Sequence, residues 1–176
     1  RVDLAGEGLD YAIRFGDGAW HGTQADPIMT APLTPLCAPE TARRIGSDAA
    51  ALAREPLLRS YRADEWPRWF AKADLPCPPL RGPIFDSSIL MIAAAMAGHG
   101  VALAPALMFE RELRGERLVR PFAQDIPAGG YWLTRLKSRQ ETPGMQQFRA
   151  WLMAAARMDA REPEAQAPPV ARTDQA

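Results

Sequence analysis

The chain has 176 residues, of which 47% are hydrophobic. That is enough apolar material for one domain or two small lobes with a buried core. The 21 Lys and Arg residues balance 21 Asp and Glu residues, and the net charge of zero does not favour binding to nucleic acid or to a membrane surface. Cys37 and Cys77 are far apart and the chain has only 2 histidines, which argues against a zinc site or a disulfide scaffold.

Targeting and membrane signals are also missing from the sequence. No apolar run approaches the ~18 residues of a membrane span, and no charged-then-apolar leader begins the chain. These features predict a cytoplasmic protein that does not contact a membrane. The chain starts with Arg1 rather than Met and enters a polar turn directly, so we expect an earlier portion to have been removed.

The first third of the chain predicts short extended segments and an interrupted helix. Residues 9–15 (LDYAIRF) alternate as a strand does, and the glycines that follow mark a loop. Residues 27–39 contain four prolines, which favours extended segments at a sheet edge or crossover over a central strand. Residues 41–55 have helical propensity that is broken at Gly46.

The middle of the chain predicts two strand and helix pairs. Residues 57–61 (LLRSY) predict a strand, and residues 64–73 predict a helix with Asp64 as its N-cap. The apolar side of this helix is formed by Trp66, Trp69 and Phe70. Residues 85–105 (FDSSILMIAAAMAGHGVALAP) predict the end of a strand, a polar turn, an apolar helix, a glycine turn and a second strand.

The last third continues the alternation. Residues 106–113 predict a helix, and residues 116–122 and 131–137 predict strands. Thr142–Pro143 supplies the cap and first position of a final helix, and from Glu162 the lack of large apolar residues predicts a disordered tail. Strands that alternate with helices predict an α/β fold with mostly parallel sheets.

Polar residues gather at the start of the apolar helix and of the last strand. The first N–H groups of a helix lack acceptors, and Asp86, Ser87 or Ser88 can each cap one of them. A helix N-terminus that follows a strand is also a place where ligands bind, so both interpretations stay open. Tyr131 follows two glycines, which would let a ligand approach its hydroxyl closely.

The residues do not indicate an enzyme. Ser88 and His99 would be separated by about 15 Å of helical rise, too far for a catalytic pair, and we expect His99 to be exposed in the glycine turn. No G-x-S-x-G, P-loop, G-x-G-x-x-G or H-E-x-x-H motif occurs. Asp3, Glu7 and Asp10 could bind a cation, but helix capping and solvation explain them more simply.

Four stretches together resemble the effector-binding domain of LysR-type transcriptional regulators. They are EGLDYAIRFGDGAWHG, LLRSYRADEW, FDSSILMIAAAMAGHGVALAP and GGYWLTRLKSRQETPGMQQFRAWL. The apolar helix followed by G-x-G-V-A-L-x-P is typical of the superfamily, whereas WHG, SYR-x-D-E-W and YWLTRL are more specific to the AmpR-type β-lactamase regulators. The resemblance runs from Arg1 to about Arg157.

The resemblance implies a periplasmic-binding-protein-like (type 2) α/β fold with an effector bound in the cleft between two lobes. Lobe one would comprise residues 1–30 plus 135–158, lobe two with its crossover segments residues 31–134, and the disordered tail residues 159–176. The family's helix-turn-helix, linker helix and first part of lobe one, which carries a pocket threonine, are not in the chain. The domain is therefore expected to be truncated at its N-terminus.

The family's pocket serine and tyrosine match Ser88 and Tyr131, and Ser87 adjoins them as a capping residue at the same site. Asp3 matches an acidic position associated with holding the basal regulatory state. The implied effectors are cell-wall muropeptides: a UDP-MurNAc-peptide that maintains repression and an anhydro-muropeptide that activates β-lactamase transcription. No cofactor and no metal ion is implied.

The resemblance also implies partners. Promoter DNA would be bound only through the absent N-terminal domain, and the full-length protein would be a homo-oligomer. The alternative is a solute-binding protein of a transport system with a similar two-lobed fold. That alternative requires export, for which the sequence shows neither a leader nor disulfide-type cysteine spacing.

Overall fold

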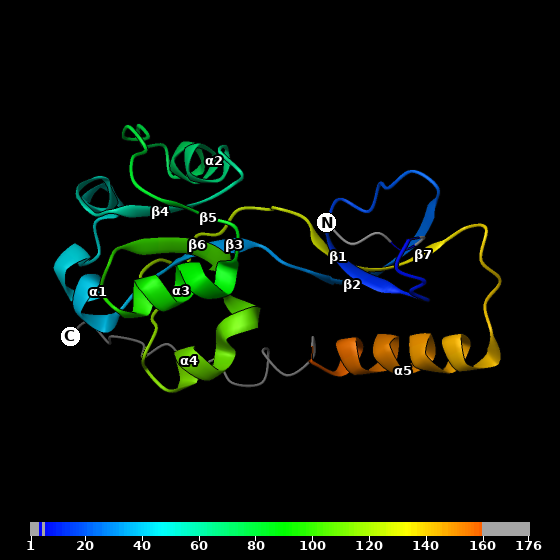
Figure 1. The fold of residues 1–176 in the computed structure, drawn as a ribbon. Helices are drawn as coiled ribbons and strands as arrows, with labels where there is room; N and C mark the ends of the chain where they lie inside the picture. Colours follow the sequence, from blue (N-terminus) through cyan, green and yellow to red (C-terminus); the bar gives the residue numbers. More distant parts are fainter. Residues whose placement is uncertain (1–3, 5, 160–176) are drawn as a thin grey trace, which may run out of the picture. The chain divides into compact units, whose positions relative to one another are not determined.

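The computed structural model describes residue 4 and residues 6–159, so the predictions for Asp3 and for the tail from Glu162 lie outside the described residues. Strands and helices alternate along most of the chain (Figure 1), which confirms the α/β class. The elements are β1 (Ala12–Gly16), β2 (Thr23–Thr30), β3 (Leu33–Leu36), α1 (Pro39–Ile45), η1 (Ala49–Arg54), β4 (Leu57–Ser60), α2 (Glu65–Lys72), β5 (Ile84–Phe85), α3 (Ser88–Met96), β6 (Val101–Pro105), η2 (Ala106–Phe109), α4 (Glu110–Arg114), β7 (Gly130–Leu136) and α5 (Pro143–Asp159), where η marks a 3-10 helix.

Contacts divide the chain into two compact units. Unit 1 comprises residues 1–30 and 130–176, and unit 2 comprises residues 31–129. The correspondence between these units and the two lobes predicted from the sequence stays a prediction.

Unit 2 is built on a four-stranded sheet with helices on both faces. The strand order is β3-β6-β4-β5, in which β4 is parallel to both β5 and β6 and only β3 is antiparallel. Successive side chains of a strand point to opposite faces, and along β6 Val101 and Leu103 face one apolar cluster while Ala102 and Ala104 face the other. Figure 1 shows α2 and α3 on opposite sides of this sheet.

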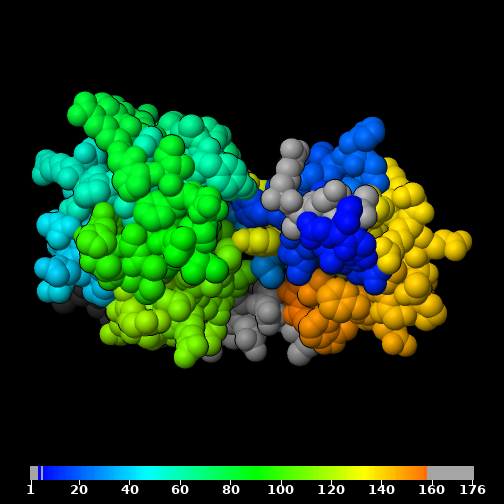
Figure 2. Space-filling view, in the orientation of Figure 1, coloured from blue at the N-terminus to red at the C-terminus, as the bar shows by residue number. Residues whose placement is uncertain are grey.

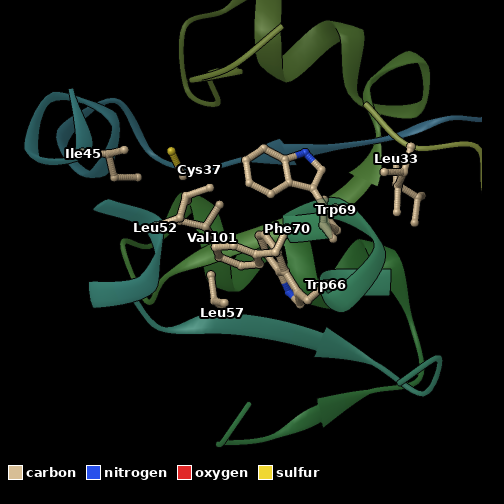
Figure 3. Packing of buried hydrophobic residues seen from close by; sticks show 11 residues of the cluster. Leu33, Cys37, Ile45, Leu52, Leu57, Trp66, Trp69, Phe70 and Val101 are labelled. Atoms are coloured by element: carbon tan, nitrogen blue, oxygen red, sulfur yellow. The ribbon is translucent and has the colours of Figure 1, made fainter. Parts of the chain in front are cut away.

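The larger cluster of unit 2 is centred on the aromatic side of α2. Trp66, Trp69 and Phe70 are at most 2% exposed, as the periodicity of this helix predicts, and their rings meet at angles from tilted to perpendicular. Residues from α1, η1 and the sheet complete the cluster (Figure 3). Both buried tryptophans have an acceptor for the indole N–H group. Trp66 donates to the carbonyl of Leu58, and Trp69 donates to the carbonyl of Gln124.

Unit 1 is built on a three-stranded sheet with α5 packed on it. The strand order is β1-β7-β2, and both pairings are antiparallel. The prediction of mostly parallel sheets is therefore wrong for this unit, because alternation of strands and helices does not reveal the direction of strands that are distant in sequence. α5 begins as predicted: the Thr142 hydroxyl accepts a hydrogen bond from the Met145 N–H, and Pro143 follows the cap.

Two other local predictions are wrong. Residues 116–122 form no strand; Val119 alone bridges to Cys37, because Glu116 has a φ of 53° and Pro121 has no N–H to donate. Asp64 does precede α2, but its backbone is already helical and its carboxylate pairs with Arg68 at 3.6 Å instead of capping the helix.

The turn after α3 follows the sequence prediction. The helix ends at Met96, and the Gly98 and His99 N–H groups donate to carbonyls of its last turn, with His99 exposed. Gly100 has a φ of +140°, and a Cβ there would lie 2.2 Å from the Pro56 carbonyl oxygen, so the turn requires glycine. None of the described helices is both long and apolar enough to cross a membrane.

Candidate functional site

Ser87 and Ser88 lie where β5 passes into α3. Ser87 is the N-cap by its extended backbone, and its carbonyl accepts the Met91 N–H at 3.0 Å. Its side chain makes no capping hydrogen bond, so the predicted capping by Asp86 or Ser87 is wrong. The extended backbone of an N-cap residue does not by itself orient the Ser87 hydroxyl toward the N–H groups of the first helical turn. Within the part of the chain that the structure describes, neither serine hydroxyl has a protein partner.

The serines lie at the carboxyl edge of the parallel strands of unit 2. β4 and β5 are hydrogen-bonded neighbours, with Ser60 opposite Phe85. Both serines are half-buried. Beside them the surface is apolar, since Ile84, Ile89 and Leu90 are each at least 58% exposed. α3 (bright green) contributes to the visible surface of unit 2 in Figure 2. Ligands of open α/β sheets bind beyond this edge.

Tyr131 lies in unit 1, at the start of the central strand β7. It is half-buried, pairs across the sheet with Phe15 and Met29, and meets the Phe15 ring edge-on at a centroid distance of 5.3 Å. The preceding Gly130 is needed by the protein itself, because a Cβ there would lie 2.5 Å from the Met29 carbonyl oxygen. Gly130 thus allows the close approach of β2, and the approach of a ligand to the Tyr131 hydroxyl stays a prediction.

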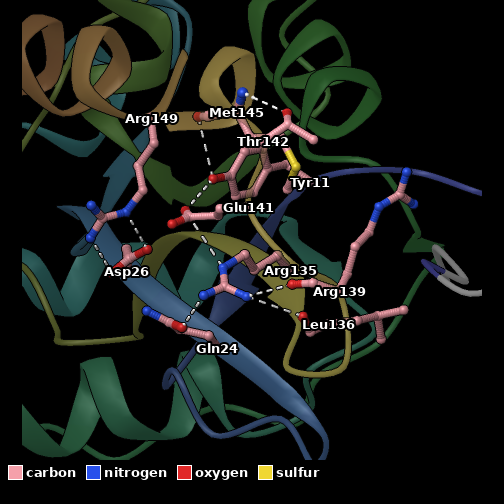
Figure 4. Close-up of polar contacts among 10 residues, drawn as sticks. All are labelled: Tyr11, Gln24, Asp26, Arg135, Leu136, Arg139, Glu141, Thr142, Met145 and Arg149. Atoms are coloured by element: carbon pink, nitrogen blue, oxygen red, sulfur yellow. Dashed lines mark hydrogen bonds and ion pairs between the residues drawn. The ribbon is translucent and has the colours of Figure 1, made fainter. Parts of the chain in front are cut away.

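Charged groups near Tyr131's sheet serve to attach α5. Figure 4 shows Arg149 of α5 donating two hydrogen bonds to the Asp26 carboxylate, at 2.7 and 2.8 Å. These bonds hold the pKa of Asp26 below its ordinary value. The Tyr11 hydroxyl donates to Glu141 at 2.7 Å; burial, and then this bond, raise the pKa of Tyr11 to about 12. A cavity of about 410 Å³ beside this network is lined by Asp26, Pro27, Arg149, Ala150, Met153, Ala154 and Arg157.

The remaining polar candidates have structural partners or positions that exclude chemistry. Ser88 begins α3 and His99 follows its end, so they cannot act as a pair. Asp10 pairs with Arg139 at 2.5 Å. Among the described residues, no three His, Cys, Asp or Glu side chains gather as a metal site would require. Burial raises the pKa of the Cys37 thiol to about 11, which disfavours the reactive thiolate.

Comparison with protein families matches residues 1–157 to the family described as the LysR substrate binding domain. The chain belongs to this family. The predicted recognition of a LysR-type effector-binding domain is confirmed, and so is the prediction of a regulator's binding domain rather than an enzyme.

Several curated relatives are named HTH-type transcriptional activator AmpR, and two of them are described below. The chain is 57% identical over 163 residues to that of Pseudomonas aeruginosa, covering 92% of this chain and 55% of the relative. It is 54% identical over 155 residues to that of Enterobacter cloacae, covering 87% and 53%. The chain thus spans about half the length of these LysR-type relatives. None of these matches supports the transport alternative.

Solved effector domains have the same fold. The effector domain of AmpR of Pseudomonas aeruginosa has a TM-score of 0.88 and 55% identity, covering 95% of this chain and 81% of that one. The AmpR effector binding domain of Citrobacter freundii has a TM-score of 0.86 and 48% identity, covering 90% and 80%. The predicted periplasmic-binding-protein-like α/β fold is confirmed.

One further solved structure is informative about hydroxyl groups. It is the Citrobacter freundii domain with a threonine replaced by valine, a serine by alanine and a tyrosine by phenylalanine; its TM-score is 0.84 at 47% identity, covering 89% of this chain and 79% of that one. The replaced serine and tyrosine of that protein are separated by the same number of residues as Ser88 and Tyr131. When the spacing between the replaced threonine and serine of that protein is counted back from Ser88, the position of the threonine lies before Arg1.

Proposed function

We propose that this chain is the ligand-sensing part of a LysR-type regulator that controls β-lactamase expression in response to cell-wall muropeptides. The observation that carries the proposal is its 57% identity to an AmpR activator across 92% of the chain. A UDP-MurNAc-peptide holds the repressing state and an anhydro-muropeptide produces the activating one. The regulator acts in the cytoplasm as a homo-oligomer, and it binds promoter DNA through a helix-turn-helix that precedes this chain.

Ser88 and Tyr131 contact the effector through their hydroxyl groups in this proposal. Ser88 is half-buried, lies beyond the carboxyl edge of parallel strands and makes no hydrogen bond within the described residues. A half-buried hydroxyl without a protein partner is available to a ligand. Support for Tyr131 comes from the equal spacing of the serine and tyrosine replaced in the Citrobacter freundii domain. Ser87 borders the same site, and Asp3 maintains the basal state.

The test is calorimetric titration of both muropeptides into the protein extended at its N-terminus to the length of its curated relatives. Ser88→Ala and Tyr131→Phe each delete one hydroxyl and keep most packing. Each should weaken binding by about 1–3 kcal/mol, the cost of an unmade hydrogen bond in a desolvated site.

Ser87→Ala is the matched control for this experiment. Because the Ser87 hydroxyl caps no N–H group, its removal should change the free energy of unfolding by less than about 0.5 kcal/mol and should weaken binding less than Ser88→Ala does. Unchanged muropeptide affinity in both Ser88→Ala and Tyr131→Phe, with normal thermal melts, would refute the assignment of the site.

A further inference from the structure

Two carboxylates with little exposure lie at opposite ends of β4. At the amino end, Glu55 accepts two hydrogen bonds from the Arg44 guanidinium, at 2.8 and 2.7 Å. At the carboxyl end, Glu65 is 5% exposed at the start of α2 and accepts the Ser60 hydroxyl at 2.6 Å. Only Glu65 is therefore at the edge of the sheet where the effector site is proposed.

The loop of residues 61–64 connects β4 to α2, and Ser60 and Glu65 flank it. The hydrogen bond between their side chains joins the two ends of the loop. The same Ser60 hydroxyl accepts the backbone N–H of Arg62 at 3.0 Å, inside the loop. The conformation of the loop therefore depends on the Ser60 hydroxyl and on the carboxylate that orients it.

The burial of Glu65 has a cost in folding stability. Burial raises the pKa of this carboxyl above its ordinary value, and the hydrogen bond from Ser60 offsets that effect only in part. An apolar side chain of similar volume is often at least as stabilising at a buried position as a charged one. Stability alone therefore does not explain a glutamate here, whereas a need to hold the loop in one conformation does.

The loop lies beside the start of α3. β4 and β5 are parallel neighbours with Ser60 opposite Phe85, and neighbouring strands are about 4.8 Å apart. The residues after Ser60 and those after Phe85, among them Ser87 and Ser88, thus leave the same edge of the sheet. Tyr61, the first residue of the loop, is 63% exposed. Aromatic side chains on loops at such an edge are typical of ligand sites.

We propose that Ser60 and Glu65 are positioning residues of the effector site, and that they hold the loop of residues 61–64 as a wall of this site next to Ser88. This inference rests on the proposed muropeptide function and adds a second segment of unit 2 that borders the ligand. Tyr61 contacts the ligand, whereas Ser60 and Glu65 act through the loop. Because their hydrogen bond orders the loop before binding, the ligand does not have to order it.

The experiment combines hydrogen exchange with calorimetric titration of an anhydro-muropeptide into the protein extended to the length of its curated relatives. In the wild type, the muropeptide should slow amide exchange in residues 61–64. Ser60→Ala should accelerate exchange of these residues in the free protein and weaken binding about 10-fold. Ser60→Thr keeps the hydroxyl, so its affinity should stay within about 3-fold of the wild type.

A double variant separates positioning from stability. Ser60→Ala combined with Glu65→Leu replaces both polar partners by apolar groups, which avoids the penalty of leaving one buried partner unsatisfied. Its thermal midpoint should therefore lie closer to that of the wild type than the midpoint of Ser60→Ala does. Its affinity for the muropeptide should remain about 10-fold lower. Recovery of wild-type affinity together with stability would overturn the positioning role.

Glu55→Ala is the matched control, because it removes the carboxylate at the other end of β4. It should lower the thermal midpoint by a few degrees and leave both the affinity and the exchange of residues 61–64 unchanged. A loss of affinity as large as that of Ser60→Ala would mean that lower stability alone weakens binding, and would overturn the inference.

The titrations also distinguish this inference from the function on which it rests. Wild-type affinity in Ser60→Ala, together with weakened binding in Ser88→Ala, would overturn the role of Ser60 and Glu65 and leave the proposed function intact. Failure of the wild-type protein to bind the muropeptide would overturn both.

Discussion

The two units of the molecule are stabilised by different kinds of contact. Unit 2 has apolar clusters on both faces of its sheet, with Trp69 and Phe70 fully buried. Unit 1 has one helix, α5, on an antiparallel sheet, and charged side chains join this helix to the sheet. The buried side chains among its described residues are fewer and smaller: Leu4, Ala12, Leu133, Thr134, Met145 and Ala156.

This difference indicates which unit responds to solution conditions. Burial of large apolar groups depends little on pH, whereas ion pairs and charged hydrogen bonds are weakened by protonation and by salt. α5 also exposes Phe148 and Trp151, so apolar packing covers only part of this helix. We therefore expect unit 2 to be held mainly by its core and unit 1 to depend on the charged groups around Asp26 and Glu141.

The largest expected effect comes from emptying the core of unit 2. Trp69→Ala removes a side chain that is 0% exposed and contacts Trp66, Phe70 and Phe122. The free energy of unfolding should fall by about 3–5 kcal/mol, as measured by urea titration, with hydrogen exchange accelerated in residues 31–129.

Trp151→Ala in unit 1 is the matched control, because this tryptophan is 63% exposed. Its removal should change stability by less than about 1 kcal/mol. Equal losses in the two tryptophan variants would contradict the contrast between a core-dominated unit and a charge-dominated one.

Some of the local structure in unit 2 could be predicted from the sequence because its signals lie close together in the chain. The spacing of Trp66, Trp69 and Phe70 identified the buried side of α2, and Gly98 and Gly100 marked the turn after α3. The antiparallel sheet of unit 1 could not be predicted, because β7 pairs with strands that are a hundred or more residues away in the chain.

The candidate site was predicted only in part. Hydroxyl groups at the start of a helix cap it or bind ligands, so the sequence alone pointed to Ser88. The absence of a capping hydrogen bond at Ser87 depends on side-chain orientation, which the sequence does not reveal.

An intermediate effect is expected from the ion pair that attaches α5. Asp26→Asn removes the charge that accepts both Arg149 bonds and should cost about 1–2 kcal/mol at neutral pH, since Arg149 is 40% exposed. The folded-state pKa of Asp26 lies below its unfolded value of 3.8. Its stabilisation is therefore complete above that value and is lost as the pH falls through the folded pKa.

Urea titrations of the wild type and Asp26→Asn between pH 3 and 7 measure this dependence. The difference between the two proteins should be constant at the upper end of the range and should shrink below about pH 4. A difference that stayed constant down to pH 3 would mean that Asp26 contributes to the attachment of α5 through packing alone.

The smallest expected effect concerns the single hydrogen bond between Tyr11 and Glu141. Tyr11→Phe keeps the ring next to Phe148 and should cost about 0.5–1.5 kcal/mol. Because burial and Glu141 raise the pKa of Tyr11 from 10.0 to about 12, its stabilisation is complete below pH 10 and is lost as the pH rises through 12. Ultraviolet titration should show a tyrosine that ionises near pH 12 in the wild type and is missing in Tyr11→Phe. If that late ionisation persisted in Tyr11→Phe, the hydroxyl would not be held by Glu141, and the attachment of α5 would rest on Asp26 and Arg149.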